Sequence, residues 1–340
     1  MRARAFGPGR VNLIGEHTDY NDGLCLPFAI AAGVTVEAAD GPDGRVEATA
    51  LDLGETDAFA LRDPEPAGGW RAFVRGTAAE LQRAGHALRG ATLTIRGDVP
   101  RGSGLSSSAA LEVALALLAH SGRPEPDRRE LARLCSRVEN DWVGAETGLL
   151  DQLAALYGRE GHAIRLDMRT LAVDPVALRL DGWRLVTVDS GVAHTHAGSG
   201  YNDRRRECRE ACAALGIASL RDARAEDAAR LPDPLDRRVR HVISENDRVD
   251  RAVAALRAGD LPALGALLDA SHASLRDDYE VSVPAVEATV ARLAAAGAAG
   301  ARIVGGGFGG AVLALFPPDA APPPDAVAVA PGPAARVLAS

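Results

Sequence analysis

The spacing of hydrophobic positions divides the chain into a part with mixed periods and a part that is mostly helical. Between residues 10 and 188, short runs in which apolar and polar positions alternate predict strands. These runs are VNLIG, GVTVEAA, RVEATA, ATLTIRG and RLVTVD. Two longer apolar patterns, at residues 70–84 and 107–119, have the spacing of helices. The mixture predicts an α+β lobe.

The second half of the chain has the helical period. Amphipathic stretches that predict helices follow Ser190, at residues 202–215, 247–258, 261–275 and 284–296. ARIV, GGGFGG and AVLALF then read as a strand, a glycine loop and a strand. The tail, PPDAAPPPDAVAVAPGPAARVLAS, is either a last edge strand after a loop or a partly disordered segment. The total of 340 residues suggests two lobes of roughly 150 residues each, which we place at residues 1–188 and 189–340.

Composition and charge exclude several classes of partner. Hydrophobic residues make up 47% of the chain and charged residues 25%, as in an ordinary globular enzyme. The net charge of −8, with no basic stretch, argues against nucleic-acid binding, and an anionic surface repels membranes. No apolar segment follows the first two arginines, and no apolar run is long enough to span a membrane, so we expect a cytoplasmic protein.

The cysteines and the basic residues limit the chemistry further. The cysteines at positions 25, 135, 208 and 212 are scattered, which predicts neither a disulfide framework nor a zinc site. The basic residues are all Arg, and a chain without Lys cannot contain the GxxxxGK[ST] P-loop. Any phosphate handling would therefore use Arg, backbone amides and a metal.

One segment has the features of an anion site. In DVPRGSGLSSSAALEVALALL, residues 98–118, a glycine-rich bend leads into three serines that open an apolar helix. Free amides at a helix start, together with the helix dipole, bind anions without Lys. Small residues at Gly102, Ser103 and Gly104 allow a close approach to a phosphate chain, and a Ser hydroxyl can bind Mg²⁺. The alternative is an ordinary N-capped helix after a turn.

Other segments have two readings each. GGGFGG, residues 305–310, fits GxGxxG, but a predicted strand follows it where a dinucleotide site needs a helix. Its glycines indicate either close contact with a ligand or the other lobe, or a flexible hairpin loop. Asp151, in GLLDQLAAL, either stabilises a helix start or is a base directed into a cleft. Glu139, in VENDW, is a metal ligand or a surface charge.

The N-terminal stretch GRVNLIGEHTDYNDG, residues 9–23, places an Arg, a Glu, a His and an Asp within ten positions. With this stretch, the glycine segments resemble, in order and spacing, the three motifs of the GHMP small-molecule kinases. Within that superfamily, GRVNLIGEHTDYNDG resembles the galactokinase signature almost letter for letter. GSGYNDRRREC (198–208), HASLRDDYEVSVP (272–284) and ARIVGGGFGG (301–310) also resemble galactokinase segments. GLLDQ and NDG depart only mildly from the family pattern.

The resemblance implies a fold. The family has a two-lobed α+β structure, with a left-handed βαβ unit in the N-terminal lobe and a ferredoxin-like C-terminal lobe. Its active site lies between the lobes.

The resemblance also implies a role for individual residues. Glu16, His17 and Asp19 would hold the galactose ring, because carboxylates and an imidazole pair with neighbouring sugar hydroxyls. Asp151 would be the base, kept ionised by Arg10. The other implied contacts are Gly148 and Tyr201 to the sugar, Gly102, Ser103, Gly104, Leu105, Ser106, Ser107 and Ser108 to the phosphates of ATP, Trp70 to the adenine, and Ser108, with or without Ser107, and Glu139 to the metal.

The implied reaction transfers the γ-phosphoryl group of ATP to the C1 hydroxyl of α-D-galactose, giving galactose 1-phosphate and ADP, with Mg²⁺. The expected partners are galactose and ATP, for a monomer or weak homo-oligomer. Two alternatives stay open: a related sugar 1-kinase acting on arabinose, galacturonate or N-acetylgalactosamine, and a sensor that binds ATP and galactose without turnover. The intact Asp151, Arg10 and SSSAA run weigh against the sensor.

Overall fold

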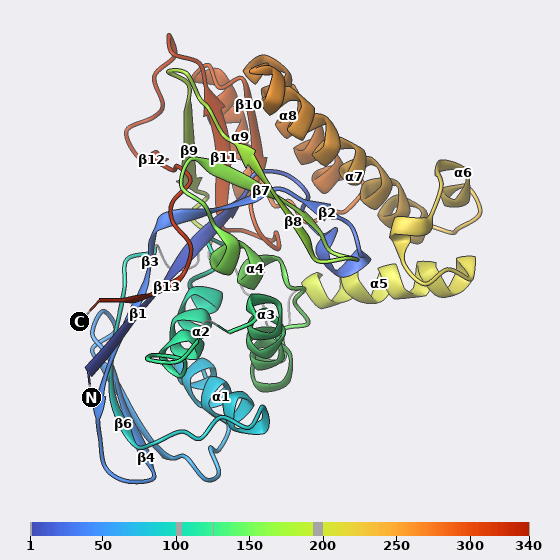
Figure 1. Cartoon of the computed structure of the whole chain (residues 1–340). Helices are drawn as coiled ribbons and strands as arrows, with labels where there is room; N and C mark the ends of the chain where they lie inside the picture. Colours follow the sequence, from blue (N-terminus) through green and yellow to red (C-terminus); the bar gives the residue numbers. More distant parts are fainter. Residues whose placement is uncertain (1, 100–103, 125, 193–199, 340) are drawn as a thin grey trace.

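The computed structural model describes residues 2–99, 104–124, 126–192 and 200–339 (Figure 1). In these residues the strands form three sheets, and the largest has the order β13-β1-β3-β6-β4-β5. β1 is antiparallel to β3, which is antiparallel to β6, whereas β4 runs parallel to β6. The bounds are β1 (Arg2–Asn12), β3 (Pro27–Asp40), β4 (Arg45–Ala50), β5 (Glu55–Ala60), β6 (Ala91–Gly97) and β13 (Arg336–Leu338).

Helices cover one face of this sheet. They are α1 (Trp70–Arg83), α2 (Ser107–Leu118), α3 (Arg128–Arg137) and α4 (Leu150–Tyr157), with a π-helix, η2 (Val138–Val143), between the last two. α2 lies against β1 and β3 and is buried over most of its length, because SSAALEVALALL is apolar nearly all round. The predicted helices at 70–84 and 107–119 are confirmed.

The second sheet has the order β10-β11-β9-β12, with bounds β9 (Arg184–Asp189), β10 (Gly300–Ile303), β11 (Ala311–Phe316) and β12 (Val327–Ala328). α8 and α9 pack on β10, and α7 packs on α8. The helices of this part are α5 (Gly200–Leu215), α6 (Ala225–Ala228), α7 (Leu235–Ala258), α8 (Leu261–Asp277) and α9 (Pro284–Ala295). A small sheet of β2 (Leu24–Cys25), β7 (His162–Asp167) and β8 (Ala172–Ala177) completes the fold, with 3-10 turns η1 (Asp19–Asn21) and η3 (Leu220–Asp222).

Helix α7 begins at Leu235, well before the predicted start at 247. The reason is that its first turns bury polar side chains, among them Arg238 and His241, so the apolar period is not visible there.

The glycine loop does connect two strands, since β10 and β11 pair antiparallel on either side of it. The tail forms edge strands: β12 pairs with β9, and β13 pairs with β1, which brings the two ends of the chain together (Figure 1).

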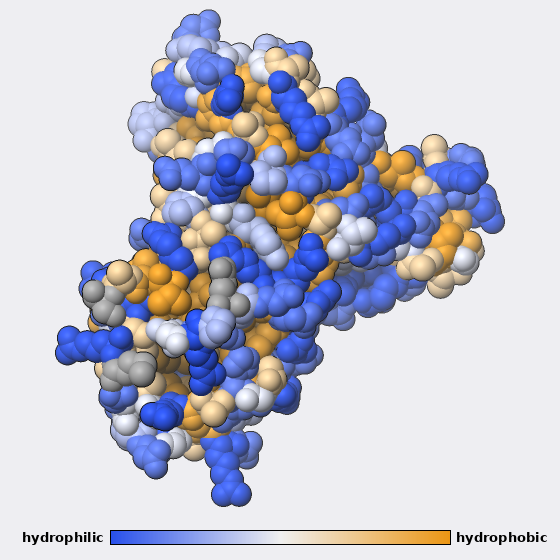
Figure 2. Space-filling view, viewed as in Figure 1, coloured by the Kyte–Doolittle hydropathy of each residue, from blue (hydrophilic) through white to orange (hydrophobic). Residues whose placement is uncertain are grey.

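The hydrophobic core that matters most for the site is shared between the two large sheets. One continuous cluster joins Leu13 and Ile14 after β1 to Val249 of α7, Leu268 of α8 and Leu313 of β11. Figure 2 shows that the surface on this side is mostly hydrophilic, with groups of hydrophobic residues between hydrophilic ones. Among the described residues, none of the helices is both long and apolar enough to cross a membrane.

Candidate active site

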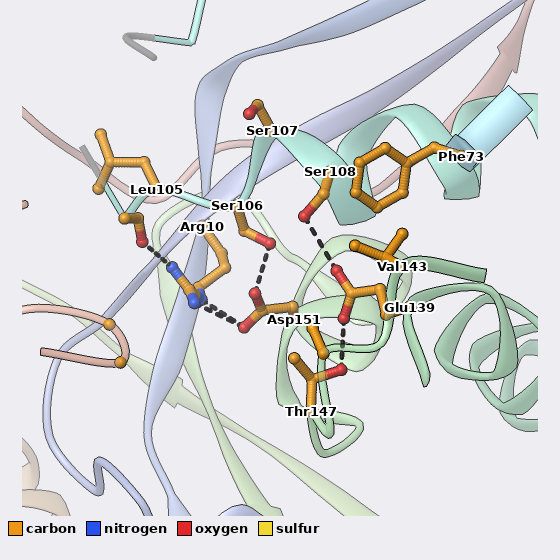
Figure 3. Close-up of a pocket in the computed structure, with 14 residues that line it drawn as sticks. Arg10, Phe73, Leu105, Ser106, Ser107, Ser108, Glu139, Val143, Thr147 and Asp151 are labelled. Carbon is orange, nitrogen blue, oxygen red and sulfur yellow. Dashed lines mark hydrogen bonds and ion pairs between the residues drawn. The ribbon is translucent and has the colours of Figure 1, made fainter. Parts of the chain in front are cut away.

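An ion pair lies where β1 ends and α4 begins. Arg10 directs Nε and Nη2 to Oδ1 of Asp151, both at 2.7 Å, and its Nη1 donates to the carbonyl of Gly104. The other carboxylate oxygen of Asp151 accepts a hydrogen bond from Ser106 Oγ at 2.5 Å. Figure 3 shows Arg10 and Ser106 approaching Asp151 from two sides. Burial opposes the charge of Arg10, but the neighbouring charges of Asp151 and Glu16 raise the pKa of Arg10.

A second carboxylate, Glu139 of η2, is held by neutral donors. Ser108 Oγ donates to its Oε1 at 2.9 Å, and Thr147 Oγ1 donates to its Oε2 at 2.5 Å (Figure 3). Gln152 Nε2 adds a contact of 3.2 Å to Oε2. Burial and the charge of Asp151 raise the pKa of Glu139. Because none of these partners is a cation, the carboxylate has unused capacity to bind one.

A cavity of about 220 Å³ opens beside these two carboxylates. Phe73 of α1 and Val143 of η2 form an apolar wall (Figure 3). The rest of the lining comes from the start of α2, both carboxylates and the glycine loop: Arg10, Gly104, Leu105, Ser106, Ser107, Ser108, Glu139, Ala145, Thr147, Asp151, Gly305 and Gly306. The cavity thus has an apolar wall at one side and the amino end of a helix at the other, which suits a ligand with a ring and anionic groups.

A second, smaller cavity adjoins the first. It shares Arg10, Thr147, Asp151, Gly305 and Gly306 with the first cavity. The remaining lining residues are Glu16, His17, Asp19, Gly148, Leu150 and Tyr201. The two cavities therefore meet at the Arg10–Asp151 pair.

The polar wall of the second cavity is the turn after β1. Glu16 is fixed at Oε1, which accepts from the amide of Gly305 at 2.8 Å and lies 3.1 Å from Nη2 of the fully buried Arg302. His17 has a φ of 61° and places its Nδ1 2.7 Å from the hydroxyl of Tyr20. Glu16 is thus oriented by one lining residue, Gly305, and by Arg302 outside the lining, and His17 is oriented by Tyr20, also outside it.

Asp19 forms the opposite side of this wall, directly against Gly148. A Cβ at position 148 would lie 2.0 Å from Oδ2 of Asp19, so any larger residue there would require the Asp19 side chain or the loop to move. Burial, with the charge of Asp151 adding to it, raises the pKa of Asp19 to about 6. The side chain is therefore a carboxylate that titrates close to neutral pH.

The glycine loop joins the two halves of the site. Gly305 has a φ of 83°, and a Cβ there would be 3.3 Å from the carbonyl oxygen of Gly104. Of the two readings of GGGFGG, the structure shows the close backbone approach. The loop also lines both cavities.

The structure brings most of the predicted site residues to these two cavities, with a few exceptions. Gly102 and Ser103 lie outside the described residues. Trp70 is not part of either lining, and its indole Nε1 donates instead to Glu55 at 2.9 Å. Phe73, one turn further along the same helix, lines the first cavity in its place. The segment WRAFVRG, residues 70–76, contains two aromatic residues, Trp70 and Phe73. The sequence does not show which of them points into the cavity, because that depends on how the helix is oriented.

The sequence reasoning also missed Thr147 and Arg302. Thr147 lines both cavities, and Arg302 holds Glu16 from β10. Neither residue has a local signal, because each acts through contacts with segments distant in the sequence.

Family models match the chain over both halves. The model of the GHMP kinase N-terminal domain matches residues 72–159, and that of the GHMP kinase C-terminal domain matches residues 252–329. The class of protein that the fold and the site define is thus the GHMP kinases. A mevalonate kinase crystal structure shares this fold with a TM-score of 0.67 at 17% identity. The model of the galactokinase galactose-binding signature matches residues 2–40.

Comparison with individual relatives shows which family within this class the chain belongs to. The galactokinase of Roseiflexus sp. (strain RS-1) is 45% identical over 320 residues, 91% of this chain and 82% of that protein. The galactokinase of Streptomyces coelicolor is 44% identical over 321 residues, 91% of this chain and 83% of that protein. The crystal structure of Lactococcus lactis galactokinase complexed with galactose matches with a TM-score of 0.90 at 34% identity, over 99% of this chain and 95% of that one. The chain belongs to the galactokinase family of ATP-dependent sugar kinases, as the sequence resemblance predicts.

Proposed function

We propose that the second cavity holds α-D-galactose and the first holds ATP, and that the γ-phosphoryl group passes between them to the C1 hydroxyl, giving galactose 1-phosphate and ADP. The observation that carries this proposal is the meeting of the two cavities at Arg10 and Asp151. Phosphoryl transfer needs in-line positioning of donor and acceptor together with compensation of charge. A shared wall that holds a carboxylate and a guanidinium offers both.

In the sugar cavity, as we now name the second cavity, Glu16, His17 and Asp19 bind ring hydroxyls. Gly148 contributes backbone, and Tyr201 closes the side. The oriented Glu16 and His17 support these roles, because a pre-positioned polar group binds a hydroxyl with little loss of entropy.

In the nucleotide cavity, as we name the first, the segment from Gly104 to Ser108 binds phosphates through the amides at the start of α2. Gly102 and Ser103 continue this loop in the sequence. Phe73 and Val143 contact the adenine ring of ATP, so in this proposal Phe73 replaces Trp70 as the aromatic contact.

The residues present fit a magnesium ion. Ser108 Oγ and Glu139 Oε1 are oxygen ligands 2.9 Å apart beside the nucleotide cavity. No cluster of three or more His, Cys, Asp or Glu suited to a metal occurs in the described ranges. Mg²⁺ commonly takes one or two protein oxygens and completes its shell with phosphates and water. Bound there, the ion would neutralise phosphate charge.

Asp151 orients the C1 hydroxyl and accepts its proton. Arg10 holds Asp151 in place and adds positive charge where the transferred group passes. Ser106, which binds the second oxygen of Asp151, links this carboxylate to the phosphate loop.

The fold that positions these groups is, in this proposal, the two-lobed one with a left-handed βαβ unit and a ferredoxin-like C-terminal lobe. The parallel pair β4 and β6 and the antiparallel sheet around β11 support it.

The test is phosphorylation of a sugar panel by wild type and Asp151→Ala. The panel contains galactose, 2-deoxygalactose, N-acetylgalactosamine, arabinose and galacturonate, with ATP as donor. We expect turnover of galactose by wild type and a loss of about a thousandfold in kcat in the variant. Preference for another sugar would keep the mechanism and change the substrate. Binding of galactose without turnover would identify a sensor and overturn the proposal.

A further inference from the structure

Helix α5 presents one face to the sugar cavity. Tyr201, Arg205 and Arg209 are spaced by four residues, so they lie in a row along the helix. Tyr201 lines the cavity. The helix begins near the centre of the molecule and runs outward (Figure 1), so Arg205 and Arg209 lie one and two helical turns further from the centre than Tyr201.

Arg205 reaches from this row to the loop between η2 and α4. Its Nη1 donates to the carbonyl of Glu146 and, at 3.1 Å, to the carbonyl of Thr147. Its guanidinium carbon lies 5.4 Å from the ring centre of Tyr20, the residue that contacts His17. One side chain on α5 thus touches two segments that form the sugar cavity.

The carbonyls that Arg205 holds belong to a critical part of the wall. The side chain of Thr147 donates to Glu139, and Thr147 lines both cavities. The next residue, Gly148, is the one packed against Asp19. A shift of this loop by a fraction of an ångström would therefore alter the contact between Gly148 and Asp19.

Arg205 also acts on the charge of Asp19. The charges of Asp151 and Glu16 raise the pKa of Asp19, in addition to burial, and the charge of Arg205 lowers it. His17 lines the same cavity as Asp19. Burial raises the pKa of three further neighbours of Asp19, the phenols of Tyr20 and Tyr201 and the thiol of Cys25, so they are neutral at neutral pH. Loss of Arg205 leaves Asp19 facing like charges without this nearby cation.

We propose that Arg205 is a positioning residue for the sugar: it fixes the loop at residues 146–148 and keeps Asp19 in the form that accepts sugar hydroxyls. The inference rests on the sugar cavity proposed above. Arg209, the last residue of the row, pairs with Glu146 Oε2 at 2.6 Å. Both of these side chains are about half exposed, so their ion pair contributes little to holding the loop. The side chain of Arg205 is less exposed, at 27%, and its hydrogen bonds to two backbone carbonyls carry the effect.

The experiment compares Arg205→Gln with Arg206→Gln, a matched control. Arg206 is the next residue on α5, is 55% exposed and pairs with Asp203 on the outer surface. Loss of charged hydrogen bonds in Arg205→Gln should raise the KM for galactose by about ten- to a hundredfold. The KM for ATP should stay within about twofold of wild type. The acid limb of kcat/KM for galactose should move to higher pH, because Asp19 is then harder to ionise.

Arg205→Lys keeps the charge and loses the planar donor pair. It should retain the acid limb of wild type while its KM for galactose still rises, and it keeps the inference testable if Arg205→Gln does not fold. Equal rises in both KM values, or a galactose KM like that of Arg206→Gln, would overturn the inference. Asp19→Asn is run beside them: if its galactose KM is unchanged, the proposed sugar cavity itself is wrong. If only the Arg205 variants are unaffected, the cavity stands and Arg205 has no positioning role.

Discussion

Among the described residues, three of the four carboxylates that line the two cavities are held in three different ways, the fourth being Glu16. Asp151 has the cation Arg10 on one oxygen and the hydroxyl of Ser106 on the other. Glu139 has only neutral donors, and Asp19 is buried near the like charges of Asp151 and Glu16 with Arg205 as a nearby cation. These surroundings suit different tasks. The charge of Asp151 is compensated, as suits a group beside the reacting hydroxyl, Glu139 has room for a cation, and Asp19 suits a neutral sugar.

The contact between Gly148 and Asp19 gives a prediction at this scale. In Gly148→Ala the added Cβ would sit 2.0 Å from Oδ2 of Asp19, so the loop and the carboxylate must move apart. We expect the KM for galactose to rise by at least about tenfold, with the KM for ATP little changed. Steady-state kinetics with each substrate varied in turn would measure this.

Gly68→Ala is the control for that variant, because a Cβ at position 68 meets no atom within 4 Å. If Gly148→Ala retained the galactose KM of the control, the close packing at this wall would have no role in substrate binding.

Helix α7 supports the site from behind the sugar cavity. Glu245 Oε1 accepts from the amide of Gly15 at 2.9 Å and from Ser271 Oγ at 2.7 Å, and Arg248 Nε lies 2.6 Å from its Oε2. One helical turn earlier, His241 Nε2 donates to the carbonyl of Glu16 at 3.1 Å. Burial lowers the pKa of His241 to about 4, so it donates as a neutral ring. The helix thus fixes the backbone that carries Glu16.

Replacing the charge of Glu245 should therefore destabilise the protein. Burial opposes ionisation, but the charge of Arg248, that of His241 once it is protonated at low pH, and further contacts hold the pKa of Glu245 at about 2. A group with a lowered pKa stabilises the fold above its unfolded pKa, here about 4.5, and that contribution is lost as the pH falls toward 2. Glu245→Gln leaves Arg248 buried without its partner and should lower the free energy of unfolding at pH 7 by about 3 kcal/mol.

Urea unfolding of Glu245→Gln at pH 7 and at pH 3 measures this effect. The decrease in the free energy of unfolding relative to wild type should be about 3 kcal/mol at pH 7 and smaller at pH 3. Asp247→Asn is the control, since Asp247 is on the same helix but 65% exposed and pairs with Arg251 at the surface. A loss no larger than that of Asp247→Asn would show that the buried pair adds nothing to stability.

Strand pairing also bears on how the chain divides into lobes. The predicted boundary at residues 188 and 189 falls within β9, whose partners are β11 and β12. We propose to place the boundary before β9, so that the second sheet stays in one lobe. β13 then returns to the first sheet as its edge strand.

For the whole molecule, the shared core makes the two lobes interdependent. The cluster that joins the residues after β1 to α7, α8 and β11 would be exposed if either lobe unfolded alone. Arg302 adds a polar link, since its Nη1 donates to the carbonyls of Asn12 and Leu13 at 2.8 and 3.0 Å. The fold is expected to behave as one cooperative unit.

This expectation gives a prediction for unfolding. Fluorescence from Trp70, Trp142 and Trp183 and far-ultraviolet circular dichroism should report one coincident transition. Galactose at a hundred times its dissociation constant should raise the free energy of unfolding by about 2.7 kcal/mol. Glucose serves as the control sugar. Two separate transitions, with galactose moving only one of them, would contradict the shared core.

The sequence by itself determined the class of fold and the segments that form the site. Local signals marked these segments: the polar turn of residues 16–19, the serines that open α2, Asp151 at a helix start and the glycine loop between two strands. For the serines, Asp151 and the glycine loop they left two interpretations, and the family resemblance favoured one of them. The resemblance to the galactokinase family, carried by the same segments, is confirmed by the comparisons. These features depend on spacing along the chain, which the sequence displays directly.

Only the tertiary structure decided which of these groups meet and what supports them. It turns Phe73 instead of Trp70 toward the nucleotide cavity, and it places Arg302 and Glu245 behind Glu16. Arg205 contacts the carbonyls of Glu146 and Thr147, which are 59 and 58 positions away in the sequence. Such contacts have no local pattern, because they join segments far apart in the sequence. In the first turns of α7, burial of polar side chains also hides the helical period.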